Sequence, residues 1–583
     1  MENKNISEKR HTLAHLLASV ILELYPNTKN TIGPAIDNGF YYDFEFETPF
    51  SDDDLKKVQT QMRKKLSGWK EFTHREVTAD EAKDFFKDNQ YKHELIDEIV
   101  AKGEKITLYT AGNFTDLCRG GHVNNPAEEI NAKSFRLDKI AGAYWRGDEK
   151  NIMLTRIYGL AFDTEEELDT YLAEKKLAEE RDHRKIGKEM DLFTFSELVG
   201  PGLPLFTPNG TAMRDAIIDR IMGIQKQYDF QKVTIPHITK PDLYKTSGHW
   251  DKFGDELFHV KSRESEFVMK PMNCPHHTQI YAAKMRSYRD LPLRFVESTM
   301  VYRDEQTGEL HGLSRVRSIT QDDGHIFCTR EQMREEIEII VNIIKEFYSS
   351  LGMLEEGKYK VELSVRDADK NTEKYIGDPA TWDDAENILE EIAKEMKLPY
   401  KRAEGEAAFY GPKLDFKFKD ALGKEWQLGT VQLDFNMPTR FGLEYTDSDG
   451  TKKTPVMIHR AIAGSLERFL SMAIPHFGGK FPLWMAPIQI SVIPISENHI
   501  DFAKEIKKML AKENFRVEMD SSDQGLGKKI RNAKVMKVPY YLVIGDKEVE
   551  SKKLGLENRD GEKIENMTIK EVVEKLLAEI KGN

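Results

Sequence analysis

The chain has 583 residues, too many for a single hydrophobic core, and this length predicts roughly three or four domains. A net charge of −13 argues against nucleic-acid binding driven by overall charge, and 39% hydrophobic residues are ordinary for a globular protein. No apolar run approaches the ~18 residues of a membrane span, and no signal peptide precedes the first helix, so we expect a cytoplasmic protein. Cys118, Cys274 and Cys328 are too few for a disulfide framework and are expected to be reduced thiols, ligands or buried fillers.

Residues 1–162 are predicted to form an α+β domain. Apolar residues recur at helical spacing in the first 24 positions, and alternating patterns at 39–46 and 105–110 indicate strands. His11 and His15 fall on the face of the first helix opposite its apolar stripe. We therefore do not expect them to be core histidines of this helix.

Two matched spacings in this domain carry titratable side chains. His11 and His15 stand four positions apart, and Cys118 and His122 repeat that spacing. Imidazoles at i and i+4 share one helix face, so the four side chains could hold a tetrahedral zinc ion. They could equally handle protons without a metal, or be an incidental set, and their spacing leaves these alternatives open.

Three further regions follow along the chain. Residues 163–195 are predicted to form a connecting helix. The segment opens with a capping box and continues without Gly or Pro as far as Gly187. Residues 196–484 predict a large domain, and residues 485–583 a small α/β domain with a largely buried sheet. The run at 528–537 has five basic residues and no acidic one, as in a solvated helix face or a phosphate-contacting patch.

The segment 291–328 predicts two long strands joined by a polar loop at 304–313. If residues 314–326 are extended, alternate positions place five polar side chains on one face. A sheet face that packs in a hydrophobic core rarely carries five polar side chains, because each buried polar group needs a hydrogen-bond partner. We interpret the face as the floor of a cleft for a polar, charged ligand. Its residues are Arg315, Arg317, Ile319, Gln321, Asp323 and His325.

Residues 457–470 predict a helix in which Gly464 permits a close approach and Arg468 projects outward. With Arg303 of the hairpin and the segment “VTIPHI” around Pro236, they resemble motifs 3, 2 and 1 of class II aminoacyl-tRNA synthetases. More narrowly, “KPMNCPHH”, “HGLSRVRSITQDDGHIFC”, “AFYGPKLDF”, “GTVQLDF” and “PVMIHRA” resemble the threonyl-tRNA synthetase family. The resemblance covers nearly the whole chain.

The resemblance implies a multidomain α+β fold. The expected domains are an α+β editing domain, a class II catalytic domain with an antiparallel sheet, and a C-terminal α/β anticodon-binding domain. The implied activity is ligation of L-threonine to tRNA(Thr) through a threonyl-adenylate made from ATP, with hydrolysis of mischarged Ser-tRNA(Thr). A homodimer is implied because motif 1 lies at the subunit interface, and the run at 528–537 becomes an expected tRNA contact. The ubiquitin-like domain common at the N-terminus of the family is expected to be absent.

The resemblance also assigns nucleotide-binding roles. Arg303 would hold the α-phosphate of ATP, Arg468 the bent-back γ-phosphate, and Glu305 would accept a hydrogen bond from the adenine amino group. Mg²⁺ would accompany the nucleotide. Further ATP contacts are expected from Arg315 and Gln427, and further catalytic residues are Gln321 and Lys413.

The family's zinc ligands correspond to Cys274, His325 and His459, with one zinc ion per subunit. A three-ligand site leaves room for the amino and hydroxyl groups of threonine to bind the zinc ion. Valine has no hydroxyl group and is therefore rejected. Serine lacks only a methyl group, worth roughly 1–3 kcal/mol, and therefore requires a second, hydrolytic site. His276 replaces the usual small residue and adds a potential ligand or bulk. Threonine contacts are expected from Gln321, Asp323 and Tyr410.

The same resemblance bears on the N-terminal histidines. His11, His15, Cys118 and His122 match the family's editing signature, with Asp116 orienting an imidazole. The family favours a metal-free hydrolytic site there, whereas related free-standing alanyl-tRNA editing proteins bind zinc. A deacylase with a relic synthetic site, a non-catalytic RNA-binding paralogue and a prolyl-tRNA synthetase are the alternatives. The complete set of arginines and zinc ligands argues against a relic synthetic site, and a prolyl-tRNA synthetase would have no use for the zinc ligands. Threonine-dependent ATP–pyrophosphate exchange distinguishes a ligase from a deacylase and from a non-catalytic paralogue.

Overall fold

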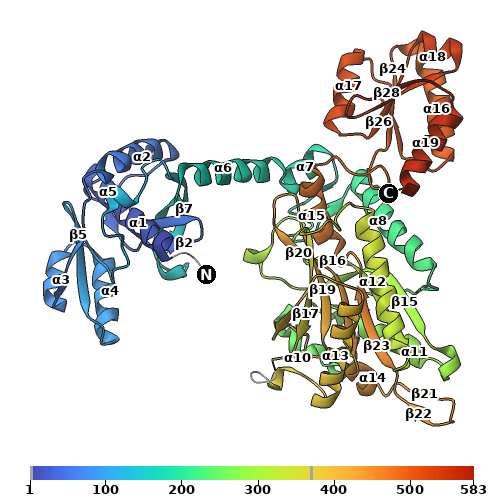
Figure 1. Cartoon of the computed structure of the whole chain (residues 1–583), viewed down its shortest axis with the longest axis horizontal. Helices are drawn as coiled ribbons and strands as arrows, with labels where there is room; N and C mark the ends of the chain where they lie inside the picture. Colours follow the sequence, from blue (N-terminus) through green and yellow to red (C-terminus); the bar gives the residue numbers. More distant parts are fainter. Residues whose placement is uncertain (1–3, 368–371, 583) are drawn as a thin grey trace. The chain divides into compact units, whose positions relative to one another are not determined.

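The computed structural model describes residues 4–367 and 372–582, and the chain divides into two compact units, Met1–Leu177 and Ala178–Asn583 (Figure 1). Each unit has its own sheets and its own buried apolar clusters. The division falls inside the segment 163–195. The domain boundaries at residues 162, 195 and 484 stay predictions.

Helix α1 (Lys4–Leu24) packs against the first sheet of the N-terminal unit and against helix α2 (Asp52–Leu66). Its apolar stripe is buried as predicted. The opposite face is covered too, because the turn that carries Cys118 and His122 lies over it, and His15 is only 3% exposed. The expectation that His15 lies outside the core was therefore wrong. The sheet runs β1-β3-β8-β7, with β2 beside β3: β1 (Lys29–Asn30), β2 (Ala35–Ile36), β3 (Gly39–Glu45), β7 (Phe135–Tyr144) and β8 (Met153–Ala161).

A second, antiparallel sheet completes this unit, and helices α3 and α4 both contact its central strand β5. After β6 the chain turns through Gly120 and Gly121, whose φ values of +91° and +84° favour glycine. This turn brings the segment 118–122 back toward α1. The elements are β4 (Thr73–Val77), α3 (Ala79–Phe85), α4 (Gln90–Ala101), β5 (Ile106–Ala111), β6 (Phe114–Leu117) and α5 (Pro126–Glu129).

The connecting segment forms two helices, α6 (Glu165–Glu180) and α7 (His183–Glu189). The predicted capping box is present, since the Glu167 N–H donates to Thr164 Oγ1 over 3.1 Å. The prediction of one continuous helix was wrong. Asp182 breaks it, because its carboxylate accepts the Arg184 N–H over 2.7 Å and caps the second helix.

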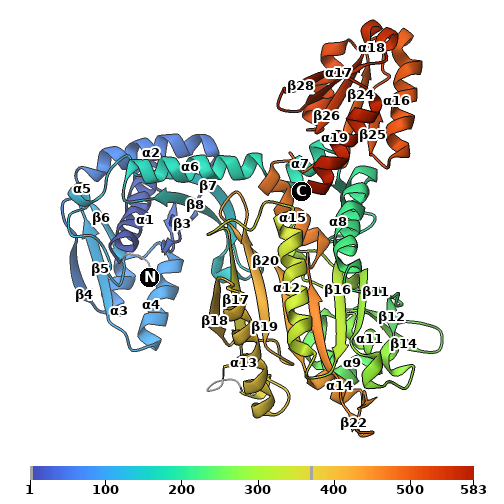
Figure 2. The same ribbon diagram turned by 45° about the vertical axis from the view of Figure 1, so that its right-hand side comes forward.

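The larger unit contains an eight-stranded sheet in the order β11-β15-β16-β23-β20-β19-β17-β18 (Figure 2). Only its two outermost pairs, β11/β15 and β17/β18, are parallel, so the sheet is mainly antiparallel, as predicted. The strands are β11 (Gln231–Lys232), β15 (Leu293–Tyr302), β16 (Ser318–Cys328), β17 (Tyr359–Val365), β18 (Tyr400–Glu404), β19 (Lys413–Lys419), β20 (Glu425–Asp434) and β23 (Val456–Ala461).

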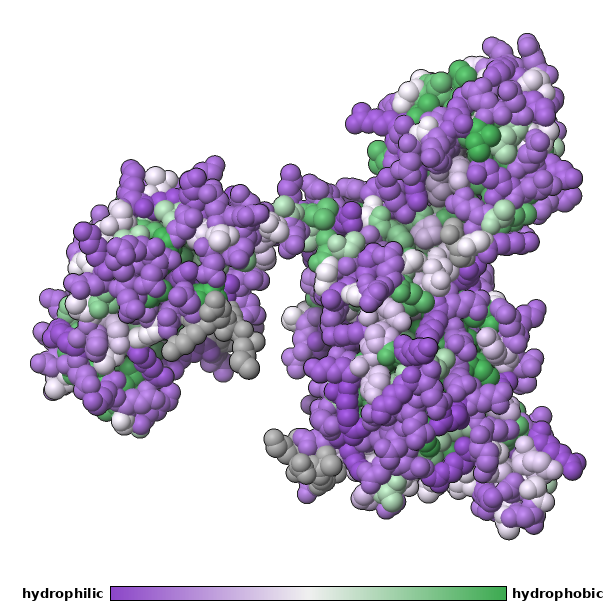
Figure 3. Space-filling model, in the orientation of Figure 1, coloured by the Kyte–Doolittle hydropathy of each residue, from purple (hydrophilic) through white to green (hydrophobic). Residues whose placement is uncertain are grey.

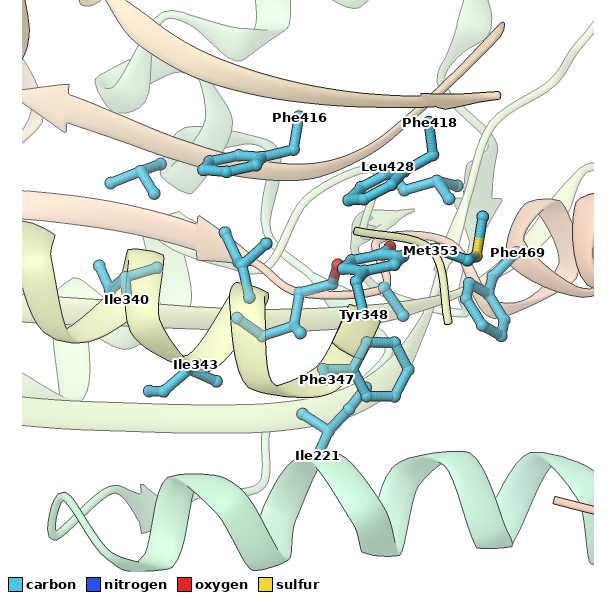
Figure 4. Packing of buried hydrophobic residues seen from close by; sticks show 14 of the residues in the cluster. Ile221, Ile340, Ile343, Phe347, Tyr348, Met353, Phe416, Phe418, Leu428 and Phe469 are labelled. Atoms are coloured by element: carbon cyan, nitrogen blue, oxygen red, sulfur yellow. The ribbon is translucent and has the colours of Figure 1, made fainter. Parts of the chain in front are cut away.

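Helix α12 (Met333–Ser349) lies between helix α8 (Pro208–Lys226) and strands β20 and β23. Figure 4 shows Tyr348 of this helix beneath Phe418 of the sheet; the two rings stack with centroids 3.8 Å apart. Phe347 packs near Phe469 of helix α15 (Leu466–Phe477). These buried contacts pack helix α12 against the strands that carry the candidate site.

Two sequence predictions are corrected by the course of the chain around this sheet. Strand β16 begins only at Ser318, so Arg315 and Arg317 belong to a longer loop, 303–317, and not to the strand face. The segment 457–470 is not one helix. Its first half is strand β23, because these residues are buried and pair with both β16 and β20.

Shorter elements surround this sheet. The helices are α9 (Pro241–Ser247), α10 (His249–Phe253), α11 (Cys274–Ala282), α13 (Pro379–Glu395) and α14 (Asn436–Arg440). The short strands are β9 (Phe193–Thr194), β10 (Leu205–Phe206), β12 (Ile238–Thr239), β13 (His259–Lys261), β14 (Glu266–Met269), β21 (Tyr445–Thr446) and β22 (Lys452–Lys453).

The C-terminal region forms a five-stranded sheet in the order β25-β24-β26-β27-β28. Its three strands β25, β24 and β26 are parallel, whereas β27 and β28 are antiparallel, so the predicted α/β domain has a mixed sheet. Its elements are β24 (Ile490–Pro494), α16 (Ile500–Lys512), β25 (Val517–Met519), α17 (Leu526–Val535), β26 (Tyr540–Ile544), α18 (Asp546–Ser551), β27 (Leu554–Asn558), β28 (Lys563–Met567) and α19 (Ile569–Gly582).

The face drawn in Figure 3 is mainly hydrophilic, with small apolar patches. Among the residues that the structure describes, no helix combines the length and apolar composition that crossing a membrane requires. Cys118, Cys274 and Cys328 are all free and buried, which fits thiols used as ligands or fillers.

Candidate functional site

A cavity of about 850 Å³ lies in the larger unit beside the loop 303–317. Strands β16 and β20, the turn after β23 and the start of α15 contribute to its wall. All five residues predicted to bind ATP line this cavity, and so does Gln321, which was predicted to take part in catalysis and to contact threonine. The five are Arg303, Glu305, Arg315, Gln427 and Arg468. The fold thus brings together side chains that are up to 165 positions apart in the sequence, Arg303 and Arg468 being the most distant (468 − 303).

Arg303 sits where strand β15 passes into the loop, and its N–H donates to the Arg317 carbonyl over 3.0 Å. Its guanidinium lies over the Phe253 ring, 5.1 Å from the centroid, and burial lowers its pKa. The buried Nε atom has no hydrogen-bond partner among the described residues. A buried guanidinium with an unused donor is suited to an anion such as a phosphate group.

Glu305 is engaged in an ion pair. Its Oε2 atom accepts from Arg315 Nε over 2.7 Å, and Arg315 also pairs with Glu309 over 2.9 Å. Arg317 donates to the Glu305 carbonyl. The loop therefore carries a network of paired charges, within which Glu305 has one oxygen committed to Arg315.

The turn between β23 and α15 presents Arg468. Gly464 has a φ of +67°, and its carbonyl accepts the Asp322 N–H over 2.8 Å. The Asp322 carboxylate in turn accepts from two backbone N–H groups of the turn and from Arg460 over 2.6 Å. Ser465 caps α15 by accepting the Arg468 N–H. No pattern in the sequence indicates this buried Asp322–Arg460 pair.

Lys413 and Gln427 meet at a carboxylate that we did not predict. Gln427 Nε2 donates to Asp415 Oδ1 over 2.7 Å, Thr430 donates to the same atom over 2.9 Å, and the Lys413 ammonium is bonded to Asp415 Oδ2. Asp415 is 2% exposed. Gln427 lines the cavity, whereas Lys413 is not among its lining residues and is linked to Gln427 through this shared carboxylate.

The second predicted group, Cys274, His325 and His459, is brought together as well. All three are buried, and their ligand atoms lie within 4.8 Å of one another. His325 and His459 are direct partners across β16 and β23, and Cys274 begins helix α11. Burial raises the pKa of the Cys274 thiol, so its thiolate needs a cation beside it.

Each of these imidazoles is oriented through its other nitrogen. His459 Nε2 lies 3.0 Å from Asp434 Oδ2, and His325 Nδ1 lies 2.8 Å from His277 Nδ1. Metal-bound histidines typically have such partners. One thiolate and two oriented imidazoles fit Zn²⁺. His276 is outside this ligand group, and neither of its ring nitrogens has a partner among the described residues.

The predicted threonine contacts border the same group. Asp323 accepts from Asn273 Nδ2 over 3.1 Å, and burial raises the pKa of its carboxyl group. The Tyr410 ring lies 5.1 Å from that of His459. His249, which we did not predict, places Nε2 3.7 Å from Cys274 Sγ, and burial lowers its pKa to about 3. A lone histidine in “SGHW” carries no spacing signal that could have indicated this.

The N-terminal unit has a separate pocket of about 300 Å³ that is lined by His11, His15, Asp116 and Cys118. Cys118 Sγ lies 3.3 Å from His122 Nε2 and 3.6 Å from His11 Nε2. The turn of Gly120 and Gly121 makes this approach possible. The four residues of the two matched spacings are therefore one cluster, and the incidental interpretation is excluded.

Burial determines the protonation of this cluster. It lowers the pKa of His122 to about 2 and that of His15 well below its usual value, and it raises the pKa of Cys118 to about 11. At neutral pH the imidazoles are uncharged and the thiol is protonated. Neutral imidazoles can accept a proton from water, and they can also serve as metal ligands.

Asp116 is held by groups other than the imidazoles. Its carboxylate pairs with Lys92 over 2.5 Å and accepts from Tyr42 Oη over 2.5 Å and from Asn30 Nδ2 over 3.3 Å. Burial lowers the pKa of His11, and the negative charge of Asp116 partly opposes this shift. Asp116 therefore acts on the imidazoles through its charge, and Lys92 and Tyr42 are members of the site that sequence spacing could not reveal.

Family models match three parts of the chain. The model for the class II core domain of tRNA synthetases (G, H, P, S and T) matches residues 258–477. The anticodon binding domain matches residues 489–579, and the second additional domain of threonyl and alanyl tRNA synthetases matches residues 106–158.

Individual proteins match over most of the chain. A threonine-tRNA ligase of Gloeobacter violaceus is 46% identical, covering 95% of this chain and 89% of its own. The crystal structure of the RNA binding domain of threonyl-tRNA synthetase from Cryptosporidium parvum superimposes with a TM-score of 0.65 and 36% identity, covering 68% of this chain and 98% of its own. Prolyl-tRNA synthetase of Giardia lamblia matches with a TM-score of 0.53 and 19% identity over 70% of this chain and 80% of its own, which shows the fold alone.

The mainly antiparallel sheet, the arginine-lined cavity and the matched core domain define a class II aminoacyl-tRNA synthetase with an editing domain and an anticodon-binding domain. The identity with threonine-tRNA ligases extends over nearly the whole chain. The chain belongs to the threonyl-tRNA synthetase family.

Proposed function

We propose that this protein ligates L-threonine to tRNA(Thr) through a threonyl-adenylate and hydrolyses Ser-tRNA(Thr) in its N-terminal unit. The observation that carries the proposal is the pairing of the arginine-lined cavity with the buried Cys274–His325–His459 group in one unit. A relic synthetic centre has no reason to keep both sets of residues.

In the activation step, the threonine carboxylate attacks the α-phosphate of ATP. Arg303, with its unused buried donor, would hold the α-phosphate, and Arg468 would hold the γ-phosphate. Holding both reactants in one cavity supplies the positioning that a two-substrate reaction needs. Gln427 and Arg315 would complete the contacts to the nucleotide, and Mg²⁺ would accompany it. Gln321 would take part in catalysis and contact threonine.

Zinc held by Cys274, His325 and His459 would offer open coordination positions to the amino and hydroxyl groups of threonine. Asp434 and His277 keep the two imidazoles oriented. Asp323 would accept from the threonine hydroxyl. An analogue without that hydroxyl would leave this buried carboxylate with one hydrogen bond fewer.

Serine has both groups that this site recognises, so it would be activated as well. In the N-terminal pocket, a neutral His11 or His122 would take a proton from the water that attacks the seryl ester. We propose that this hydrolysis proceeds without metal, with Asp116 and Lys92 as a fixed charged pair at the pocket wall.

The remaining features of the proposal concern assembly and partners. The segment around Pro236, which resembles motif 1, is proposed to form a homodimer interface. The C-terminal domain would bind the anticodon of tRNA(Thr), and the protein is proposed to act in the cytoplasm.

The proposal is tested by ATP–pyrophosphate exchange across a panel of amino acids. Threonine should support exchange strongly, serine weakly, and valine and proline not at all. A protein that contains its zinc but shows no threonine-dependent exchange would be a deacylase or a binding protein. Exchange dependent on proline would mean that the protein is a prolyl-tRNA synthetase.

A further inference from the structure

A buried histidine of the connecting segment holds the tip of the loop 303–317. His183 is the first residue of α7, and its side chain is 8% exposed. Its Nε2 atom accepts the backbone N–H of Leu313 over 3.1 Å. An imidazole that accepts at Nε2 carries its proton on Nδ1, which lies 3.8 Å from the Asp182 carboxylate.

The loop is shaped to allow this contact. Gly312 has a φ of +49°, and a Cβ atom at this position would lie 2.3 Å from His183 Nε2. The neighbouring Leu313 side chain is fully buried in the same apolar cluster as Ile186 of α7. A hydrogen bond, a close approach of the backbone at Gly312 and the buried Leu313 side chain thus fix the tip against α7.

Both arms of this loop carry nucleotide-binding residues. Arg303 and Glu305 precede the tip and Arg315 follows it, and all three line the cavity. The base of the loop is held separately, because the Arg317 N–H donates to the Gly202 carbonyl over 2.8 Å. With base and tip both attached, the arms between them have little freedom to move.

We propose that His183 is a positioning residue for ATP, which fixes the tip of the loop so that Arg303, Glu305 and Arg315 face the nucleotide. This inference rests on the proposed role of the cavity in binding ATP. Burial lowers the pKa of His183 to about 4, so the imidazole is an acceptor throughout the neutral range. Its partner is a buried backbone N–H, whose loss of an acceptor is costly.

The test compares His183→Gln with His183→Met, two side chains of similar length of which only glutamine offers an acceptor. In threonine-dependent pyrophosphate exchange with full-length protein, we expect the methionine variant to raise the KM for ATP roughly tenfold, the equivalent of about 1.4 kcal/mol. Its KM for threonine should stay within about twofold. The glutamine variant should keep most of the wild-type affinity for ATP.

Lys185→Gln is the matched control, because Lys185 is an exposed residue of the same helix and should leave both KM values unchanged. Amide hydrogen exchange within residues 303–317 should be faster in His183→Met than in His183→Gln. If His183→Met fails to fold, Gly312→Ala replaces it, since the added methyl group would push the tip away from His183 and should raise the KM for ATP as well.

Two outcomes would overturn the inference. One is an unchanged KM for ATP in a folded His183→Met protein. The other is that the glutamine and methionine variants are affected equally, with a lower kcat, a higher KM for both substrates and a lower Tm. This would mean that His183 only stabilises the fold. Failure of the proposed function is distinguishable, because the wild-type protein would then show no threonine-dependent exchange.

Discussion

Cys274 is a fully buried thiol beside two imidazoles whose remaining nitrogens already have partners. Replacing Cys274 by serine removes the thiolate and leaves a poor ligand for zinc. We expect Cys274→Ser to lose both its zinc and its threonine-dependent exchange, as measured by metal analysis and by the exchange assay on the same preparation.

Cys118→Ser is the control for this variant, because it changes the buried thiol of the other unit. It should keep the zinc and the exchange activity. Full activity in a zinc-free Cys274→Ser protein would contradict the ligand assignment. One tightly held zinc per chain in Cys274→Ser would mean either that His325 and His459 retain the metal or that His11, His15, Cys118 and His122 bind it, and in the second case the metal-free proposal for editing would be wrong.

His15 lies at the bottom of the N-terminal cluster, with its Nδ1 atom buried and without a partner among the described residues. The His15 ring packs edge-on against His11 and His122, the imidazoles proposed to accept the proton, with centroids 5.0 and 4.7 Å away. We expect His15→Ala to displace them, so that threonine charging stays intact while Ser-tRNA(Thr) accumulates by at least tenfold, because impaired proton transfer typically costs about 10²–10⁴ in rate. Acid-gel or thin-layer analysis of tRNA charged with serine measures this. His74→Ala, which changes an exposed histidine of β4, should not accumulate Ser-tRNA(Thr).

At the scale of elements, strand register decides which side chains meet in the candidate metal-binding group. The pairing of β16 with β23 sets His325 directly opposite His459, and β20 sets Gln432 opposite His459 on the other side. A shift of one residue would turn these side chains to the opposite face of the sheet. The spacing of 134 positions between the two histidines (459 − 325) carries no trace of this register.

Helix α17 refines the prediction made for the basic run at 528–537. Lys529 is 3% exposed and donates to the Pro494 carbonyl, so it is not available to RNA. Lys528, Arg531 and Lys534 are exposed and follow one another at intervals of three, which places them on one side of the helix. The run is therefore a three-residue basic face on a helix of the domain matched as anticodon-binding.

Replacing Lys528, Arg531 and Lys534 by glutamine should weaken tRNA binding and raise the KM for tRNA, whereas exchange without tRNA should stay unchanged. The slope of log affinity against log salt should fall by about 0.7–0.9 for each phosphate that the variant no longer neutralises. Filter binding across salt concentrations measures the slope. The triple replacement of Lys504, Lys507 and Lys508 on α16 is the matched control, and an equal effect of both triples would indicate unspecific attraction by charge.

At the scale of the whole molecule, buried histidines make stability depend on pH. His15 and His183 have folded-state pKa values well below 6.5, that of His183 being about 4, because burial disfavours their charged forms. Between pH 6.5 and 5 the unfolded chain therefore binds protons that the folded chain does not. The contribution of these neutral, buried histidines to the free energy of unfolding is therefore complete above pH 6.5 and is lost as the pH falls.

We expect the free energy of unfolding to decrease as the pH is lowered from 7 to 5, where most carboxyl groups do not yet titrate. His183→Gln keeps an acceptor but cannot take up a proton, so its stability should fall less over the same range. Urea unfolding at several pH values measures both proteins. An identical pH dependence of the two would mean that His183 does not contribute.

The proposed homodimer is tested by sedimentation equilibrium, which should give twice the chain mass of 67.3 kDa. A single-chain mass at micromolar concentration would contradict the proposal. The interface would involve the segment that contains Pro236.

Much of the candidate site could be predicted from the sequence. Arg303, Arg468 and the Cys274–His325–His459 group were identified because their surrounding motifs resemble one family. The structure brings each set together, although their individual roles stay proposals. The α+β composition and the capping box at Thr164 follow from local patterns of apolar and polar residues, which depend on near neighbours in the chain. The mainly antiparallel central sheet was implied by the family resemblance.

Only the tertiary structure decided which groups surround those residues. The partners Asp434, His277, Asp415 and His183 come from distant segments, and nothing in their own spacing marks them. The break at Asp182 and the strand β23 were mispredicted because a cap and two neighbouring strands override local helical propensity. Hydrogen bonds between distant segments depend on register and packing. Local sequence patterns therefore determined the elements and the chemistry-bearing motifs, and three-dimensional packing determined their geometry, burial and pKa values.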